Sequence, residues 1–402
     1  MIPRAMERYL RDRLPDSVWE NSLTRAGGQC FLEFDATDVD QLARLGIVAD
    51  ALGPFRVVGL WDEAAPEEIG GYLVVDNLAM GQPAMGGIRM LPEVTPAAIH
   101  NLARGMTLKN AAADLPFGGG KAGIVAGAPV NTPEHAAIVR GFARLLRRYQ
   151  AVYIPGPDVG TNDADMRAIA AENGLDAAVS KTVDMGGNRI DQLGAAAGGA
   201  VIALEALLTE MPRLTVLPQF ADLRVPAPAE LTVLIQGFGA VGAHVARHLS
   251  ERLPAARVLG VSDAQGCLYA EDGLPAAELF QRWQAHGLVT RPYFLEALAQ
   301  AVGPAAKYSS QANDLLREDA FCLIPAAPVA NYLDTDPATH PAVTVEKMGR
   351  WRLSVEGANT YSPDPARQAA RARMERAVYR QRGVLIATDY LVNSGGVIFA
   401  AQ

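Results

Sequence analysis

Two lysines that could do chemistry lie in one short segment, residues 109–123, with the sequence KNAAADLPFGGGKAG. Lys121 directly follows three glycines, which have no Cβ atoms to keep a ligand away from the backbone. In such a confined, water-poor place an ammonium is destabilised, so we expect the pKa of Lys121 to fall towards the range where it can exchange protons. A glycine-rich surface turn with a solvated lysine is the alternative. A phosphate-binding loop is disfavoured, because Leu115 and Ala122 stand where that motif needs Gly and Ser or Thr.

An acidic partner is offered by Asp158 in the segment PGPDVG, residues 155–160. This segment follows a predicted strand that ends at Ile154, and proline and glycine make it stiff and exposed. Functional groups are often found in loops of this kind. The alternative is that Asp158 only caps the helix predicted over residues 163–173.

The surrounding pattern predicts how Lys109 is presented. Thr95-Pro96 is a good helix start, so we expect a helix from Thr95 to about Ala113 with Lys109 near its end. The glycine-rich residues 81–89 are expected to form a loop. The three glycines before Lys121 are expected to form a second loop, and a strand is expected to follow over residues 122–126.

A dinucleotide-binding motif lies further along the chain. Residues 231–236 read as an apolar strand, residues 237–242 (GFGAVG) fit G-x-G-x-x-G, and a helix is predicted over residues 243–253. A second strand, residues 257–262, ends in Asp263, about 20 residues after the last glycine, where a ribose-binding acid is expected. The glycines would let a pyrophosphate reach the N–H groups at the helix N-terminus. Downstream, the arginines of a helix predicted over residues 364–381 are expected to form a solvated face.

Composition narrows the class of protein. The 402 residues carry a net charge of −8, which argues against a nucleic-acid partner. Three widely spaced cysteines suggest no disulfide framework and no metal site, and a reducing, cytoplasmic location is expected. The charged N-terminus does not resemble a signal peptide, and no membrane partner is expected.

Several motifs in sequence order resemble the glutamate/leucine/phenylalanine/valine dehydrogenase family over most of residues 70–400. They are GGIRM (86–90), MTLKNAAADLPFGGGKAGI (106–124), GPDVGTNDADM (156–166), QGFGAVG (236–242), VSDAQGCLYAEDGL (261–274), IPAA (324–327), EGANTYSP (356–363) and NSGGV (393–397).

The resemblance implies a reaction and a role for individual residues. Lys109 corresponds to the lysine that holds the substrate α-carboxylate, Lys121 to the lysine that activates water, and Asp158 to the acid that carries protons to and from the amino group. Gly87 lies in the turn beside the substrate, and Asn359 corresponds to the asparagine at the nicotinamide end. The implied reaction is the reversible oxidative deamination of an L-amino acid to a 2-oxo acid and ammonia.

Substrate choice depends on two further positions. Glutamate enzymes of the family have a lysine before the GG pair and a serine three residues after the valine of NxGGV, which here is Val397. Met85 and Ala400 stand at those places, so a side-chain carboxylate would be buried without a partner, which is costly. An apolar side chain fits better, as in the leucine and phenylalanine enzymes, and Gly156 leaves room for a bulky group.

The resemblance also implies the cofactor. NAD is favoured, because Asp263 would accept a ribose hydroxyl and repel a 2′-phosphate, although some relatives with an acid there use NADP. The implied cofactor-binding residues are Gly237, Phe238, Gly239, Ala240, Val241, Gly242, Asp263, Ala326 and Asn359.

The expected fold class is α/β with two domains and an active site in the cleft. A substrate-binding and oligomerisation domain is expected over residues 1–190, joined by residues 383–402, and a Rossmann NAD-binding domain over residues 191–382. A homo-oligomer is implied.

Two alternatives stay open. One is a glutamate dehydrogenase that binds the side-chain carboxylate through other residues. The other is a non-catalytic dinucleotide-binding homologue. This is suggested by Ala197, where the family usually has threonine, and by Gln402, the last residue, where family chains continue. Retention of Lys109, Lys121 and Asp158 argues against it.

Overall fold

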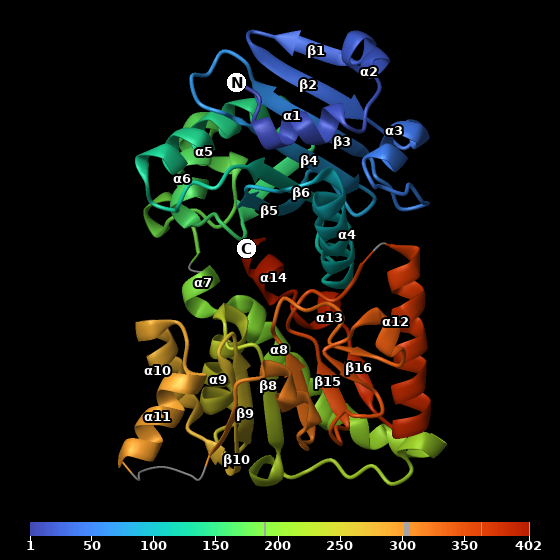
Figure 1. Cartoon of the computed structure of the whole chain (residues 1–402), viewed down its shortest axis with the longest axis vertical. Coiled ribbons are helices and arrows are strands. Elements are labelled where there is room, and N and C mark those ends of the chain that lie inside the picture. Colours follow the sequence, from blue (N-terminus) through green and yellow to red (C-terminus); the bar gives the residue numbers. More distant parts are fainter. Residues whose placement is uncertain (189, 301–305, 363, 402) are drawn as a thin grey trace. The chain divides into compact units, whose positions relative to one another are not determined.

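The computed structural model of the chain describes residues 1–188, 190–300, 306–362 and 364–401. The chain forms two compact units, Met1–Ile190 with Val397–Gln402, and Asp191–Gly396. Each unit has a seven-stranded sheet and flanking helices (Figure 1), so the expected α/β class with two domains is confirmed.

The first unit has the strand order β1-β2-β3-β4-β6-β5-β7. Along this order the pairs from β1 to β6 are antiparallel, whereas β5 runs parallel to both of its neighbours, β6 and β7. Its strands are β1 (Leu23–Ala26), β2 (Gln29–Phe34), β3 (Arg56–Asp62), β4 (Gly70–Asn77), β5 (Ala84–Leu91), β6 (Gly118–Val125) and β7 (Tyr153–Pro157), and its longer helices are α1 (Arg4–Arg11), α2 (Asp16–Asn21), α3 (Val39–Arg44), α4 (Pro96–Ala112), α5 (Pro133–Leu146) and α6 (Asp163–Asn173).

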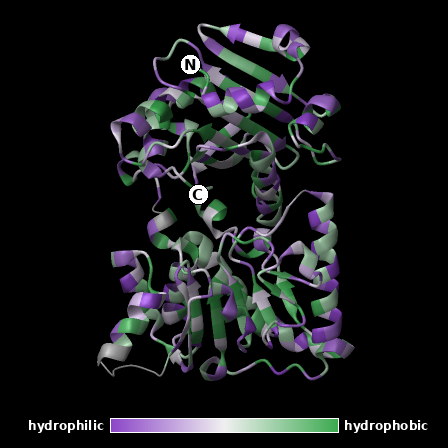
Figure 2. Cartoon of the chain, viewed as in Figure 1, coloured by the Kyte–Doolittle hydropathy of each residue, from purple (hydrophilic) through white to green (hydrophobic). Residues whose placement is uncertain are grey.

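Both faces of this sheet are covered by helices. Side chains alternate along a strand, so Phe31 of β2 packs into one core with Phe142 of α5, and Leu32 packs into another with Leu10 of α1 and Ile99 of α4. Figure 2 shows the strands largely in green and the helices with mixed purple and green. The sheet is therefore a buried support for whatever its strand ends carry.

Two glycine-rich segments expected to be loops are in fact buried strands. Residues 84–89 lie in β5, and Gly118 to Gly120 begin β6 rather than preceding a strand. A Cβ atom on Gly119 would overlap the Thr107 side chain of α4, and one on Gly86 would overlap the carbonyl oxygen of Gly120. The expectation was wrong because it read these glycines as room for a ligand, when they allow α4 and two strands to approach closely.

The second unit has the strand order β11-β10-β9-β8-β12-β15-β16, in which β9, β8, β12, β15 and β16 are parallel. Its strands are β8 (Thr232–Gln236), β9 (Arg257–Asp263), β10 (Gly266–Leu274), β11 (Lys307–Ser309), β12 (Cys322–Pro325), β15 (Leu353–Val355) and β16 (Leu385–Ala387), with a small pair β13 (Leu333–Asp334) and β14 (Val343–Thr344). Its helices are α7 (Ile190–Leu193), α8 (Ala195–Glu210), α9 (Ala240–Arg252), α10 (Ala276–His286), α11 (Thr290–Gln300), α12 (Pro365–Ala377), α13 (Asp389–Val392) and α14 (Gly395–Ala400), which spans the division between the units.

This topology places the expected dinucleotide motif at a strand switch. The first strand, β8, has β9 on one side and β12 on the other, and ligands of open parallel sheets bind at the carboxyl ends of strands at such a point. Residues 383–396, expected to join the first domain, lie in the second unit because β16 pairs with β15.

One stretch, Ala195–Val216, is long and apolar enough to cross a membrane by length and composition. In the structure it includes α8, whose Ala200, Val201 and Leu204 belong to the core of the second unit. A core helix passes the same test, and the absence of a membrane partner stays a prediction.

Candidate functional site

The structure brings Lys121 and Asp158 together in the first unit. Lys121 lies in β6 and Asp158 directly after β7, and Lys121 Nζ is 3.1 Å from Asp158 Oδ2. A Cβ atom on Gly87 would lie 3.0 Å from Lys121 Nζ and 2.9 Å from Asp158 Cβ, so only glycine leaves this space open. Lys121 is buried, as expected of a confined lysine, but its ammonium has a carboxylate partner.

Arg89 is a third member of this group that the sequence analysis did not single out. Its Nε donates to Asp158 Oδ2 at 3.0 Å, so one carboxylate oxygen contacts two cations. Burial alone would raise the pKa of Asp158, but Lys121 and Arg89 hold that pKa well below its usual range. Asp158 is therefore held in its ionised form. The sequence did contain a signal for Arg89, because this residue belongs to the GGIRM motif that also contains Gly87.

The loop that carries Asp158 is fixed to β5. The Asp158 N–H donates to Thr161 Oγ1 at 2.9 Å, and the Thr161 hydroxyl donates to the Ile88 carbonyl oxygen at 2.7 Å. The alternative in which Asp158 caps α6 is wrong, because Asn162 is the cap and forms a capping box with Asp165. The position of Asp158 is thus set by contacts other than helix capping.

Lys109 lies in the last turn of α4, as expected, and Thr95 caps that helix by accepting from the Ala98 N–H at 3.2 Å. Further along α4, His100, Arg104 and Thr107 all contact the buried Asp76 of β4, at 3.2, 2.7 and 2.6 Å. These contacts fix the helix that presents Lys109. These three residues are spaced so that they lie on one face of the helix, but the sequence analysis did not predict that they share a carboxylate.

Four further substrate candidates are also placed in the first unit, whereas Asn359, expected to contact both substrate and cofactor, lies in the second unit. Met85 in β5 is 2% exposed. Gly156 lies in β7, where a Cβ atom would come 3.1 Å from Val179 Cγ2. Val397 and Ala400 lie in α14, in the segment assigned to the first unit.

In the second unit the three glycines of the dinucleotide motif differ in their surroundings. Gly237 has φ +90°, and a Cβ atom there would lie 2.5 Å from the Ala327 nitrogen. A Cβ atom on Gly242 would overlap the Gly237 carbonyl oxygen. Gly239, in contrast, has no atom within 4 Å of such a Cβ, so the fold itself does not require glycine there. In this motif the second glycine is the one that lets a pyrophosphate come close to the backbone, and Gly239 is that glycine.

The other expected cofactor residues lie around this turn, in different settings. Phe238 is buried in the core of the second unit, whereas Ala240 and Val241 begin α9. Ala326 follows β12, and its N–H donates to the Gln236 carbonyl oxygen at 2.7 Å. Ala197 is 1% exposed within α8 and belongs to the core. The side chain of Phe238 therefore packs inside the protein, and any contact with a ligand would come from its backbone.

The carboxylate of Asp263 accepts hydrogen bonds from other groups of the protein. Oδ2 accepts from the N–H groups of Val289 and Thr290 at 2.8 and 2.9 Å, and Oδ1 accepts from the Thr290 hydroxyl at 2.6 Å and the Gln265 N–H at 2.9 Å. A carboxylate offers about four acceptor positions, so these contacts occupy them. A ribose hydroxyl would have to displace one of them, and Asp263 as it stands contributes negative charge at the end of β9.

Asn359 lies in a loop that follows β15, residues 356–361, and the structure adds Asn393 beside it. Asn393 Nδ2 donates to Asn359 Oδ1 at 3.1 Å and to the Gly357 carbonyl oxygen at 3.2 Å. Asn393 begins NSGGV but was not named as a candidate. Only the fold shows that these two motifs meet.

Comparison with known proteins agrees with these features. The Glu/Leu/Phe/Val dehydrogenase dimerisation domain matches residues 60–174, and the Glutamate/Leucine/Phenylalanine/Valine dehydrogenase domain matches residues 186–402. The glutamate dehydrogenase of Thermotoga maritima is 30% identical over 384 residues, which are 93% of this chain and 80% of that protein. The catabolic NAD-specific glutamate dehydrogenase RocG of Bacillus subtilis is 28% identical over 352 residues, 85% of this chain and 72% of that protein.

Among solved structures, the hetero-hexameric glutamate dehydrogenase from Thermus thermophilus in its Leu-bound form resembles the whole fold. Its TM-score is 0.61 at 26% identity, covering 99% of this chain and 80% of that chain.

Proposed function

Because the chain belongs to the glutamate/leucine/phenylalanine/valine dehydrogenase family, we propose that it catalyses the NAD-dependent oxidative deamination of an L-amino acid with an apolar side chain. The observation that carries the chemistry is the pair of buried Lys121 and half-buried Asp158, with Gly87 leaving space beside both groups.

The proton transfers follow from this pair and from Lys109. The Lys109 ammonium would hold the substrate α-carboxylate. Ionised Asp158 would accept a proton from the substrate ammonium, which frees the nitrogen lone pair so that the Cα–H bond can break. Bound NAD would accept the hydride. Lys121 would then take a proton from the water that attacks the iminium carbon. Asp158 would return its proton to the leaving ammonia and take up the hydroxyl proton as the carbonyl forms.

The dinucleotide motif supports a cofactor of this kind. Gly237 and Gly242 shape the turn, Gly239 is open, and the N-terminus of α9 follows directly, where N–H groups and the helix dipole favour a pyrophosphate. The negative charge of Asp263 disfavours a 2′-phosphate, which supports NAD over NADP. RocG, described as NAD-specific, points the same way.

Replacing Gly239 by alanine is expected to weaken NAD binding by about tenfold or more, with little loss of stability, because the new methyl meets no protein atom but takes space beside the helix N-terminus. Titration of NAD into the purified variant and a thermal melt measure the two effects. Gly242→Ala is the matched control, because it should lower the melting temperature through its clash with Gly237. Unchanged NAD affinity in Gly239→Ala would contradict this placement of the pyrophosphate.

The apolar substrate is supported by Met85, which is buried and offers no partner to a carboxylate. Glutamate is the second candidate, because the relatives described above are glutamate dehydrogenases. The deciding experiment is kcat/KM for NADH formation with Leu, Val, Ile, Phe, Trp, Ala and Glu, with NADP in parallel. We expect the highest value with an apolar amino acid. Turnover with glutamate alone would overturn the apolar assignment and leave the dehydrogenase assignment standing.

A further inference from the structure

The loop 356–361 lies at the edge of the second unit's sheet where the expected cofactor residues gather. The Ala358 N–H donates to the Pro325 carbonyl oxygen at the end of β12, at 2.8 Å. A Cβ atom on Gly357 would lie 3.3 Å from Val241 Cγ1, so the loop runs next to the glycine turn. Its conformation therefore decides where Asn359 stands at the carboxyl edge of the parallel strands.

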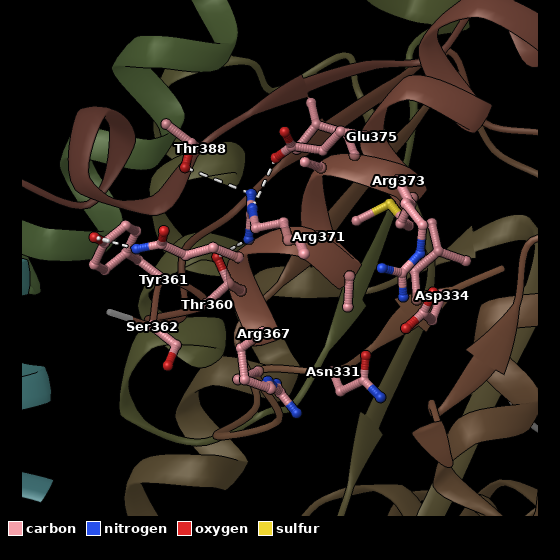
Figure 3. Close-up of a pocket in the computed structure, with 18 of the residues that line it drawn as sticks. Asn331, Asp334, Thr360, Tyr361, Ser362, Arg367, Arg371, Arg373, Glu375 and Thr388 are labelled. Atoms are coloured by element: carbon pink, nitrogen blue, oxygen red, sulfur yellow. Dashed lines mark hydrogen bonds and ion pairs between the residues drawn. The ribbon is translucent and has the colours of Figure 1, made fainter. Parts of the chain in front are cut away.

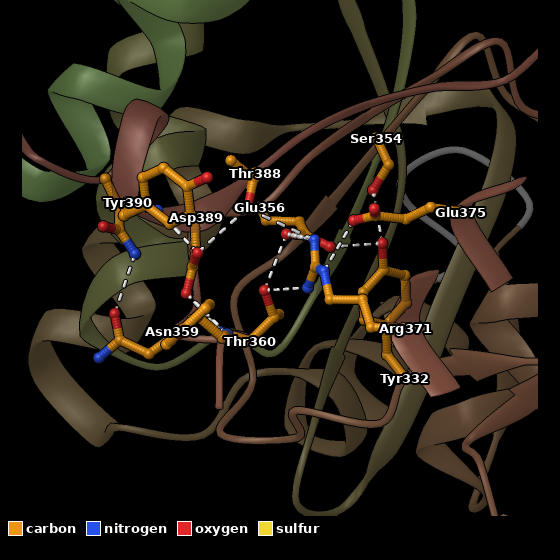
Figure 4. Close-up of polar contacts among 12 residues, drawn as sticks. Tyr332, Ser354, Glu356, Asn359, Thr360, Arg371, Glu375, Thr388, Asp389 and Tyr390 are labelled. Carbon is orange, nitrogen blue, oxygen red and sulfur yellow. Dashed lines mark hydrogen bonds and ion pairs between the residues drawn. The ribbon is translucent and has the colours of Figure 1, made fainter. Parts of the chain in front are cut away.

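Arg371 of α12 connects that helix to this loop (Figure 4). Its Nη2 donates to Glu356 Oε2 at 2.6 Å and its Nη1 to Thr360 Oγ1 at 2.5 Å. Its Nε donates to Glu375 Oε1 of the same helix at 2.7 Å. With a side chain 17% exposed, Arg371 contradicts the expectation that the arginines of this helix form only a solvated face.

The partner of Arg371 is fully buried. Glu356 is 0% exposed, and its oxygens also accept from the Tyr332 hydroxyl at 2.9 Å and the Thr360 hydroxyl at 2.8 Å. Burial raises the pKa of Glu356, while Arg371 favours its charged form. Without Arg371 the carboxylate would lose its cation and would have to take up a proton or draw in water, and either change alters its contact with Thr360.

The other side of the loop is held by a second carboxylate. Asp389 Oδ2 accepts from the N–H groups of Thr360 and Tyr361 at 2.7 and 3.0 Å. Thr360 is therefore fixed by its backbone to Asp389 and by its side chain to Glu356 and Arg371. Asn359, the residue before it, has little freedom to move while both sets of contacts are in place.

Arg371 also lines a cavity of about 910 Å³ whose walls include residues of α12, β13 and β16 (Figure 3). Arg373 lines the same cavity, two residues further along the helix, and its side chain is exposed. Among the contacts found for the described residues, none joins Arg373 to the loop. The cavity gives a small solute a route to the position of the Arg371 guanidinium, and Arg373 is a natural control.

We propose that Arg371 is a positioning residue for the proposed dehydrogenase reaction, holding loop 356–361 so that Asn359 stands at the carboxyl edge of the second unit's sheet. The proposal rests on the proposed function, since it assigns Arg371 an effect on turnover without contact with substrate or cofactor.

The test compares Arg371→Ala with Arg373→Ala in the full chain. For Arg371→Ala we expect kcat to fall by about 10²-fold, since small misplacements of binding groups have effects of this size. Affinity for ADP-ribose, which needs the glycine turn but not Asn359, should be unchanged, whereas affinity for NAD should fall. Millimolar guanidinium, which can enter the cavity, should restore much of the lost kcat and should have no effect on Arg373→Ala.

Three results would overturn the proposal: an unchanged kcat in Arg371→Ala, an equal loss in Arg373→Ala, or parallel losses of ADP-ribose and NAD affinity. If Arg371→Ala does not fold, Arg371→Lys replaces it. Lysine keeps the charge but reaches fewer partners, so we expect an intermediate kcat at an unchanged melting temperature. If the wild-type chain turns over no amino acid, the proposed function fails, and the comparison of NAD with ADP-ribose affinity still decides the role of Arg371.

Discussion

Lys121→Ala is expected to lose nearly all amino-acid oxidation while keeping its affinity for NAD. A group that transfers protons at the reacting centre contributes about 10²–10⁴-fold to the rate, and kcat should fall by that factor. The variant should fold, because Asp158 keeps Arg89 as its partner at 3.0 Å and no carboxylate is left without a cation. Initial rates at saturating substrate, with NAD titration and a thermal melt, measure the three quantities.

The control for Lys121→Ala is Lys307→Ala. Lys307 is an exposed lysine in the second unit whose 3.5 Å pair with Glu271 is solvated on both sides, so its loss should change neither rate nor stability. Retention of more than about a tenth of wild-type kcat in Lys121→Ala would contradict proton transfer by this lysine, given the factors expected of general acid–base catalysis.

Asp76→Ala is expected to cause the largest loss of stability. Asp76 is 0% exposed and accepts from His100, Arg104 and Thr107 of α4. Removing one side of a buried ionic network costs about 3–5 kcal/mol, because the buried Arg104 would keep only its contacts with Asp50. Urea denaturation, followed by circular dichroism, measures the decrease in the free energy of unfolding of the first unit.

Asp50→Ala is the matched control for Asp76→Ala, because Asp50 binds the same arginine from the surface. Its side chain is 46% exposed and Arg104 would keep its contact with Asp76, so we expect a smaller loss of stability than for Asp76→Ala. Equal losses for the two variants would show that burial of Asp76 does not decide the stability of this network. Since α4 carries Lys109, Asp76→Ala should also raise KM for the amino acid.

The sequence predicts best those features that depend on neighbours along the chain. The helix start at Thr95-Pro96 and the glycine turn before α9 are local, since capping and backbone approach to a helix N-terminus involve only adjacent residues. Both are found within a few residues of where the pattern puts them.

The features that the sequence did not predict depend on residues far apart in the chain. Gly119 belongs to a strand because Thr107 packs over it, and Asp263 caps α11 because Thr290 lies beside it. Arg371 looked like part of a solvated charged face until the fold placed Glu356 within 2.6 Å. Spacing along one chain contains no information about such tertiary partners, so local patterns misread them.

The most direct test of the proposed function is the stoichiometry of one reaction. The wild-type chain would be incubated with NAD and the preferred L-amino acid, and NADH, ammonia and 2-oxo acid would be measured in the same sample. Oxidative deamination predicts equal amounts of all three. NADH without ammonia, or no NADH with any amino acid while NAD still binds, would contradict it and favour a different hydride donor or a dinucleotide-binding protein without turnover.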